Sequence, residues 1–203
     1  MPASLTDAEI RDLVRRVVQR TMGTAAPTPA SGPGPARVGG VAQSAVQAGR
    51  PEGAVALGAD HGGYALKETL KTFVTGLGYR VIDCGTDSTN AVDYPDFAYA
   101  VARLVSEGRA WRGIVVDGAG IGSAIAANKV PGVRAALCYD YTTAMNSREH
   151  NDANVLALGA GLIGPSLAQQ IVQTWLAANF GGGRHQRRVD KIVEIEKRFL
   201  RDR

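Results

Sequence analysis

From Ala54 onward the chain alternates short apolar runs with helix-like patterns and has no long break. The apolar runs cover residues 54–58, 79–83, 112–117, 133–138 and 154–158. Helical patterns occupy about 63–77, 95–107, 121–129, 140–149 and 165–179, and a last helix runs from about 184 to 200. Continuous apolar strands that alternate with helices are typical of a parallel sheet covered on both faces. We therefore predict a doubly wound, Rossmann-like α/β fold with a five-stranded parallel sheet and a C-terminal helix.

The residues before this alternation differ from it in composition. Residues 1–22 contain an isolated amphipathic segment, and residues 23–53 are rich in Gly, Pro, Ala and Ser. A segment of the second kind buries too little apolar surface to fold and is typical of a flexible tether. The sequence thus predicts an amphipathic helix in 1–22, a linker in 23–53 and a folded domain in 54–203.

Composition excludes several classes of protein. No apolar run approaches the roughly 20 residues that span a bilayer, and no signal peptide is visible, so we expect a cytoplasmic protein without a membrane partner. The formal net charge of +4 is concentrated near the C-terminus, where only Phe199 stands among the basic residues. Nucleic-acid binding favours more interleaved aromatics, and we expect no nucleic-acid partner. The two cysteines, Cys84 and Cys138, are expected to be buried thiols.

Polar residues follow the predicted strands. The third strand ends at Asp117 and leads into a loop with Gly118, Gly120 and Gly122, which then enters a helix. Backbone N–H groups and a helix N-terminus at a strand's carboxyl end can hold an oxyanion or a phosphate. We expect further polar residues on the same rim, namely Asp60, His61, Asp83, Cys84, 93–96 and 148–152. Such a rim indicates a small, polar, anionic ligand.

Asp117 has two interpretations at this stage. A desolvated carboxylate can serve as the base in sugar isomerisation. A helix N-terminus and several N–H donors instead favour the ionised form and a weaker base, and the side chain would then cap its own loop. Both interpretations stay open.

Six phrases in fixed order resemble the ribose-5-phosphate isomerase B / galactose-6-phosphate isomerase family. They are Gly58-Ala-Asp-His-Gly-Gly63, Asp93-Tyr-Pro-Asp96, Gly118-Ala-Gly-Ile-Gly122, Ala126-Ala-Asn-Lys-Val-Pro-Gly132, Arg148-Glu-His-Asn-Asp152 and Gly182-Gly-Arg-His-Gln-Arg-Arg188. The resemblance covers about residues 54–199. It implies interconversion of aldose and ketose phosphates. It also implies a pocket formed between two subunits, and therefore a homodimer or a larger homo-oligomer. The sequence shows no metal-ligand cluster and no nucleotide-binding fingerprint, so we expect no cofactor and no metal.

The resemblance also implies roles for individual residues. The catalytic residues would be Asp117, at the position of the proton-transfer base, and His150, which would open the sugar ring. The sugar would be bound by Asp60, His61, Tyr94 and Asn151. The enediolate oxygen would be held by the backbone N–H groups of Gly118, Ala119, Gly120 and Gly122. The phosphate would be bound by Arg184 and Arg188. Structural alternatives remain, because the histidines and Tyr94 can serve packing and the two arginines can form a solvated face. His185 either faces a partner's pocket or solvent.

Three positions depart from the family's pattern. Asp117 replaces the usual cysteine base, Ala119 replaces a hydroxyl residue, and Gly161 replaces a phosphate-binding arginine. Loss of one charge-assisted hydrogen bond weakens phosphate binding by about 1.5–3 kcal/mol. Two functions therefore remain, a sugar-phosphate isomerase and a non-catalytic sugar-phosphate-binding or scaffold subunit.

The N-terminal segment carries an apolar stripe formed by Ile10, Leu13, Val14, Val17 and Val18. This spacing places the five side chains on one helix face, which needs a partner. Residues 4–22 with their linker resemble the encapsulation peptides that bind shell proteins of bacterial microcompartments, and this predicts location in a microcompartment lumen. An organelle-targeting helix, a membrane-surface helix and packing on the protein's own surface are the alternatives.

Overall fold

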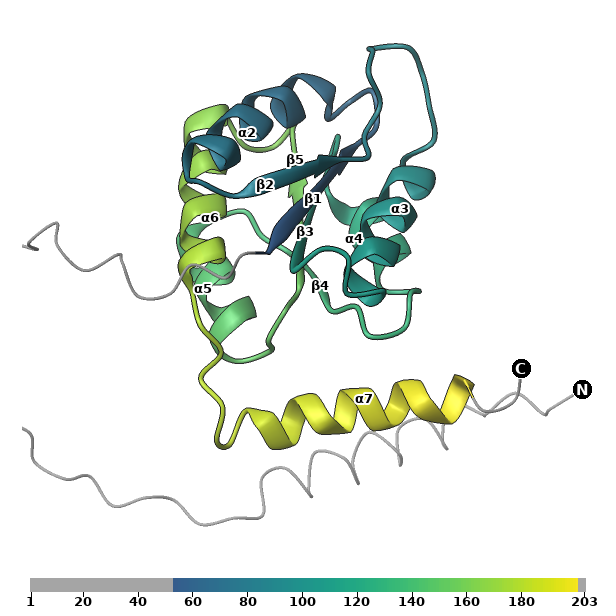
Figure 1. Ribbon diagram of the computed structural model, residues 1–203, viewed down its shortest axis with the longest axis vertical. Coiled ribbons are helices and arrows are strands. Elements are labelled where there is room, and N and C mark those ends of the chain that lie inside the picture. The colour runs from purple at the N-terminus through teal and green to yellow at the C-terminus, as the bar shows by residue number, and fades with distance from the viewer. Residues whose placement is uncertain (1–52, 201–203) are drawn as a thin grey trace, which may run out of the picture. The chain divides into compact units, whose positions relative to one another are not determined.

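The computed structural model describes residues 53–200. The amphipathic segment and nearly all of the linker lie outside the described residues (Figure 1). Within residues 53–200, no helix is long and apolar enough to cross a membrane.

A five-stranded parallel sheet forms the centre of the domain, with strand order β2-β1-β3-β5-β4. The strands are β1 (Ala54–Ala59), β2 (Arg80–Asp83), β3 (Arg112–Asp117), β4 (Ala135–Leu137) and β5 (Val155–Gly159). The helices are α2 (Tyr64–Gly76), α3 (Tyr94–Ser106), α4 (Ile121–Ala127), α5 (Tyr141–Glu149), α6 (Pro165–Ala177) and α7 (Gln186–Leu200). The predicted fold and the order of its elements are confirmed. The strand expected at 133–138 is shorter than predicted.

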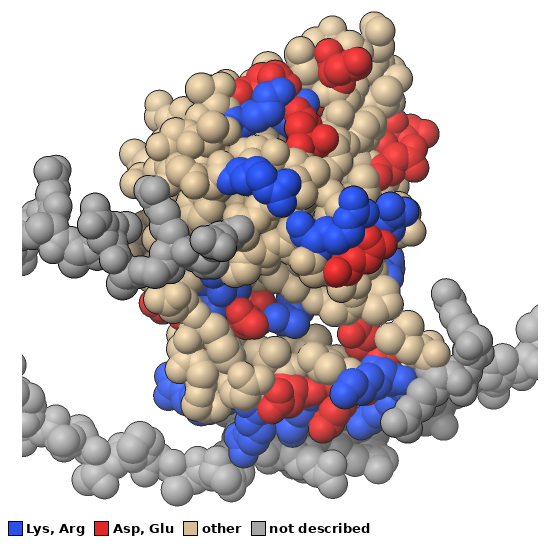
Figure 2. All heavy atoms as spheres, viewed as in Figure 1, with Lys and Arg blue, Asp and Glu red and all other residues tan. Residues whose placement is uncertain are grey.

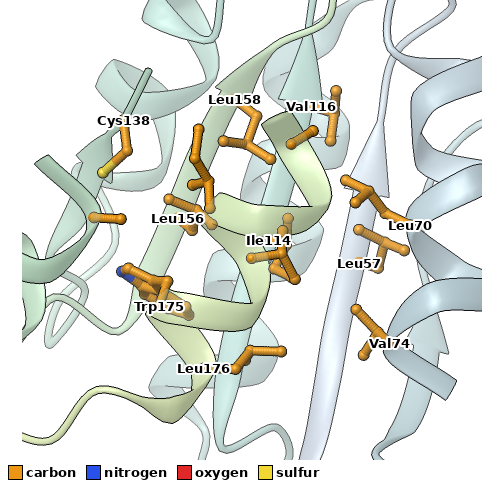
Figure 3. Close-up of a cluster of buried hydrophobic side chains, with 14 of the residues drawn as sticks. Leu57, Leu70, Val74, Ile114, Val116, Cys138, Leu156, Leu158, Trp175 and Leu176 are labelled. Atoms are coloured by element: carbon orange, nitrogen blue, oxygen red, sulfur yellow. The ribbon is translucent and has the colours of Figure 1, made fainter. Parts of the chain in front are cut away.

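Helices cover both faces of the sheet (Figure 1). Helices α2, α5 and α6 pack on one face, where Trp175, Leu70 and Ile114 are fully buried with their neighbours (Figure 3). Helices α3 and α4 pack on the other face through smaller side chains such as Val101 and Ala124. The β-branched run Ile114-Val115-Val116 suits a strand that is buried on both sides.

Local signals in the sequence define the start of α5. The Asp140 side chain accepts the N–H of Thr143, and the Thr143 hydroxyl lies 3.3 Å from the Asp140 nitrogen. This reciprocal capping box directs the helix away from the carboxyl end of β4. Because α5 leads to β5, which is parallel to β4, its last turn must lie at the opposite, amino edge of the sheet.

Contacts at the amino edge confirm this direction. Arg134, which directly precedes β4, donates from Nε to the carbonyls of Asn151 and Asp152. Arg112, the first residue of β3, donates to the carbonyls of Trp175 and Leu176 at the end of α6. The expectation that residues 148–152 share one rim with Asp117 is therefore wrong. The six residues of β3 separate the two edges by about 16 Å.

Candidate active site

The loop after β3 folds around the side chain of Asp117, which is only 4% exposed. Its Oδ1 accepts the N–H groups of Ala119, at 2.8 Å, and of Gly120. Its Oδ2 accepts the N–H of Ser123 at 2.9 Å. Gly120 has φ +77°, a backbone conformation that suits glycine. Asp117 therefore caps its own loop.

This capping changes the expected oxyanion site. The N–H groups of Ala119 and Gly120, which were expected to hold a ligand oxygen, already donate to Asp117. Within residues 53–200, the N–H groups of Gly118 and Gly122 have no protein acceptor. Of the four loop N–H groups expected to hold the enediolate oxygen, those of Gly118 and Gly122 are thus available to a ligand, as is that of Ile121.

Asp60 and His61 lie beside this loop at the end of β1. The buried Asp60 accepts the N–H of Gly63 at 2.9 Å. A Cβ on Gly62 would lie 3.4 Å from the nitrogen of Gly118, so the two turns are in contact. His61 is exposed, and its Nδ1 lies 3.1 Å from the carbonyl oxygen of Val92 and 3.2 Å from its nitrogen. His61 thus holds the segment that leads to Tyr94.

Tyr94 packs directly on the glycine loop. A Cβ on Gly122 would come within 2.6 Å of the Tyr94 ring, so only glycine permits this contact. The ring nevertheless remains 41% exposed. The structure therefore brings Asp60, His61, Tyr94 and residues 117–122 together at the carboxyl edge, and we call this set the loop half-site.

The other predicted residues lie at the amino edge. His150 follows α5, and its ring stacks on that of His185 with centroids 4.2 Å apart and planes 4° apart. The N–H of Gly181 donates to the carbonyl of Glu149 and ties the two segments together. We call His150, Asn151, Arg184, His185 and Arg188 the histidine half-site.

Positive charge surrounds the stacked rings. Desolvation, His150 and the two exposed arginines, Arg184 and Arg188, all lower the pKa of His185. Arg184 Nε lies 3.4 Å from His185 Nε2. Along α7, basic and acidic side chains are intermixed (Figure 2), and the two arginines precede or begin this helix. A bound anion would offset the local positive charge.

Partly buried ion pairs hold the backbone of the histidine half-site. Asp152, which has φ +46°, binds Arg134 and Arg148 through its two carboxylate oxygens, each at 2.8 Å. Arg148 also donates to the carbonyls of Ala153 and Ala178. One guanidinium therefore links both chain segments that carry the half-site.

Gly161 stands against the loop half-site. Its N–H donates to the carbonyl of Gly118 at 2.9 Å, and a Cβ there would lie 3.0 Å from the same oxygen. The position is exposed and carries no charge. The loop half-site thus contains two acidic residues, Asp60 and Asp117, and no basic side chain other than the imidazole of His61.

Sequence reasoning missed Asn146. This residue lies one turn before His150 on α5, and its Nδ2 is 2.8 Å from His150 Nδ1. The spacing of four residues on a predicted helix was the available signal, since such residues share a helix face.

A parallel α/β sheet with a glycine loop at its carboxyl edge and a cluster of histidine and arginine at its amino edge defines a class of proteins that bind small anionic ligands. The chain belongs to the Ribose/Galactose Isomerase family, whose sequence pattern matches residues 55–192.

Three relatives illustrate this similarity. A solved structure of Clostridium thermocellum ribose-5-phosphate isomerase B is 55% identical, with a TM-score of 0.71, and the match covers 72% of this chain and 99% of that chain. Ribose-5-phosphate isomerase B of Escherichia coli is 46% identical over 144 residues, which are 71% of this chain and 97% of that protein. D-erythrulose-4-phosphate isomerase of Pectobacterium atrosepticum is 44% identical over 144 residues, 70% of this chain and 94% of that protein.

Proposed function

We propose that this protein is an aldose–ketose isomerase that acts on a sugar phosphate through an enediolate. Membership of the family and similarity to sugar phosphate isomerases support this class. The observation that carries the proposal is the buried carboxylate of Asp117, set in a glycine loop beside Asp60 and Tyr94. A carboxylate in this position is suited to take a proton from carbon.

The two oxygens of Asp117 are not equivalent. Oδ1 accepts two N–H groups and Oδ2 accepts one. A carboxylate has about four lone-pair positions, so Oδ2 keeps one free. In the proposed reaction, Oδ2 takes the C2 proton of the open-chain aldose phosphate and returns it to C1, while a proton moves from O2 to O1. The N–H groups of Gly118 and Gly122 hold the enediolate oxygen.

We further propose that the complete pocket forms between two copies of the chain. The loop half-site and the histidine half-site lie at opposite edges of one sheet, about 16 Å apart along β3, so one copy alone does not bring them together. Apolar side chains beside the loop, including Ile121, Ile125 and Leu162, are exposed and suit an interface. In the dimer, His150 and Asn151 of one copy open and bind the sugar whose C2 proton faces Asp117 of the other, while Arg184 and Arg188 bind its phosphate.

Pentose 5-phosphates and tetrose 4-phosphates are the proposed substrates. The Escherichia coli and Pectobacterium relatives are named for a ribose 5-phosphate and an erythrulose 4-phosphate, respectively. Gly161 leaves the loop half-site without an arginine, so phosphate binding depends on the histidine half-site. We expect weaker phosphate binding than with an arginine at this position.

The test is isomerisation of pentose 5-, tetrose 4- and hexose 6-phosphates in D₂O, with deuterium incorporation at C2 followed by NMR. The native chain should form product and incorporate deuterium from solvent. Asp117→Asn should bind substrate but lose exchange by a factor of at least about 10², and Asp117→Cys, which restores a proton acceptor, should regain part of it. Asp87→Asn, which removes an exposed carboxylate in the loop after β2 at the same edge, is the matched control.

A non-catalytic sugar-phosphate-binding or scaffold subunit is the second candidate. The observation that favours it is the capture of loop N–H groups by Asp117, which leaves fewer donors for an enediolate. Binding of sugar phosphates without product or deuterium exchange across the whole panel would support this candidate and contradict the isomerase.

Packaging into a bacterial microcompartment is a separate proposal, supported by the sequence pattern of residues 4–22 alone. Deletion of residues 1–22 should leave kcat and KM unchanged but abolish co-purification with shell proteins. Retained association after the deletion would exclude this segment as the attachment site.

A further inference from the structure

Asn146 contacts both His150 and Asn151, two residues of the histidine half-site. Its backbone carbonyl accepts the N–H of His150 at 3.0 Å and the Asn151 amide nitrogen at 3.3 Å. Its own amide nitrogen, Nδ2, lies 2.8 Å from His150 Nδ1. One exposed side chain therefore contacts the ring of His150, while its backbone holds Asn151.

The direction of these hydrogen bonds determines where the proton on His150 lies. An amide nitrogen only donates, so the Nδ1 that receives it must be unprotonated. The Asn151 amide nitrogen lies 3.5 Å from Asn146 Oδ1, which supports this orientation of the Asn146 amide. A neutral imidazole that accepts at Nδ1 carries its proton on Nε2.

The stack with His185 restricts the ring further. The two imidazoles are nearly parallel, so His150 cannot tilt out of this plane without losing the stack. A 180° flip of the ring would keep the stack but would move Nδ1 away from Asn146 Nδ2. Arg184 Nε donates toward His185 Nε2, which leaves the His185 proton on its buried Nδ1. In this arrangement His150 presents Nε2–H on the edge away from Asn146.

We propose that Asn146 is a positioning residue that fixes His150 in its Nε2–H tautomer and holds it ready to donate a proton during ring opening. This inference rests on the proposed function, in which His150 opens the sugar ring. In that step the Nε2 proton passes to the ring oxygen and the C1–O bond to the ring oxygen breaks. The anomeric hydroxyl passes its proton through a water molecule back to Nε2, which leaves the free aldehyde and returns the imidazole to its starting form.

The first test measures the tautomer directly and needs no activity. The chain contains three histidines, so long-range ¹H–¹⁵N spectra of the labelled full-length protein contain three ring systems, and His61→Gln and His185→Phe assign them. We expect Nε2–H for His150 in the native protein and a mixture of tautomers in Asn146→Ala. Asn146→Asp should switch the ring to Nδ1–H, since a carboxylate only accepts. Thr142→Ala, an exposed change on the same helix, should resemble the native protein.

The second test separates ring opening from proton transfer. Ribose 5-phosphate is a closed ring in solution, whereas erythrose 4-phosphate cannot close a five-membered ring because its O4 carries the phosphate. Asn146→Ala should lower kcat for ribose 5-phosphate at least about tenfold and change kcat for erythrose 4-phosphate less than about twofold. An equal loss of kcat with both sugars would show that Asn146 has a structural role and does not act in ring opening.

The outcomes distinguish the two proposals. If the native protein is inactive but substitution of Asn146 still changes the His150 tautomer, the proposed function is overturned. The effect of Asn146 on the ring is then still supported. An Nδ1–H tautomer in the native protein, or no response to either Asn146 substitution, would overturn the inference even in an active enzyme.

Discussion

At the scale of single residues, Asp117 determines how the loop half-site is used. Its carboxylate occupies donors of the very loop that was expected to bind the ligand. Three N–H groups donate to its two oxygens and so fix the orientation of the side chain. The same contacts hold the loop in place for Gly118 and Gly122.

Gly161 offers a direct test of charge at this edge. Gly161→Arg adds a guanidinium beside the glycine loop, and the short approach of its Cβ to the Gly118 oxygen requires only a small shift. We expect KM for a sugar phosphate to fall about tenfold, since a charge-assisted hydrogen bond contributes roughly 1.5–3 kcal/mol. Steady-state kinetics measure this change.

Gly164→Arg is the matched control, because a Cβ at Gly164 meets no neighbour and the position is equally exposed. An equal fall in KM for both variants would indicate general electrostatic attraction, and no fall for either would place the phosphate away from Gly161.

Residue-level prediction from sequence succeeded where a motif fixed the local geometry. Asp60, His61 and Tyr94 were placed around the glycine loop because each follows or begins an element at the end of a parallel strand. The capture of the Ala119 and Gly120 N–H groups by Asp117 was not predictable, since it depends on the path of the loop.

At the scale of elements, the contact between α2 and β2 is made by ion pairs. The ammonium of the buried Lys67 lies 3.0 and 2.9 Å from the two carboxylate oxygens of Asp83, and Lys71 binds one of them at 2.9 Å. Burial alone would raise the pKa of Asp83, but the hydrogen bonds from Lys71 and Lys67 outweigh it and lower the pKa. The charged form is therefore favoured by folding.

This shift predicts a pH dependence of stability. Because the pKa of Asp83 is lower in the folded chain, the unfolded chain takes up the proton first as the pH falls below about 4. The stabilisation by Asp83 is present above that pH and is lost as the pH falls through the folded-state pKa. The difference in Tm between the native protein and Asp83→Asn should therefore be constant from pH 7 to about 5 and shrink toward pH 3.

Calorimetry at several pH values measures this difference. Asp87→Asn, which removes an exposed carboxylate in the loop after β2, should show no comparable trend. A difference in Tm that grew with acidity would contradict the assigned direction of the pKa shift.

Sequence patterns located every helix and strand of residues 53–200 to within a few residues. The apolar runs are buried strands, and the helical periods match the faces that pack on the sheet. The error concerned direction, because residues 148–152 were assigned to the carboxyl edge although α5 must return to the amino edge before β5 begins. Considering the connection between two parallel strands would have placed them correctly.

At the scale of the whole molecule, the separation of the half-sites predicts complementation between two inactive variants. Asp117→Asn damages the loop half-site and His150→Ala damages the histidine half-site. A mixed dimer has one pocket with both lesions and one pocket with neither. When equal amounts of the two variants are unfolded, mixed and refolded together, half of the dimers should be mixed. The sample should therefore recover about a quarter of the native activity.

The activity of the refolded mixture, compared with each variant refolded alone, measures this recovery. Mixing Asp117→Asn with Asp117→Ala tests for unspecific rescue, since no combination of these chains restores a native loop half-site. A mixture of Asp117→Asn and His150→Ala that stayed inactive while forming mixed dimers would show that each pocket belongs to a single chain.

Because the half-sites lie at opposite ends of β3, the proposed activity also depends on the association of two chains. If the protein is diluted below the dissociation constant of its dimer, its turnover per molecule should decline, and concentrating the sample should restore it. Kinetic constants measured with very dilute protein would therefore report association between copies as well as chemistry.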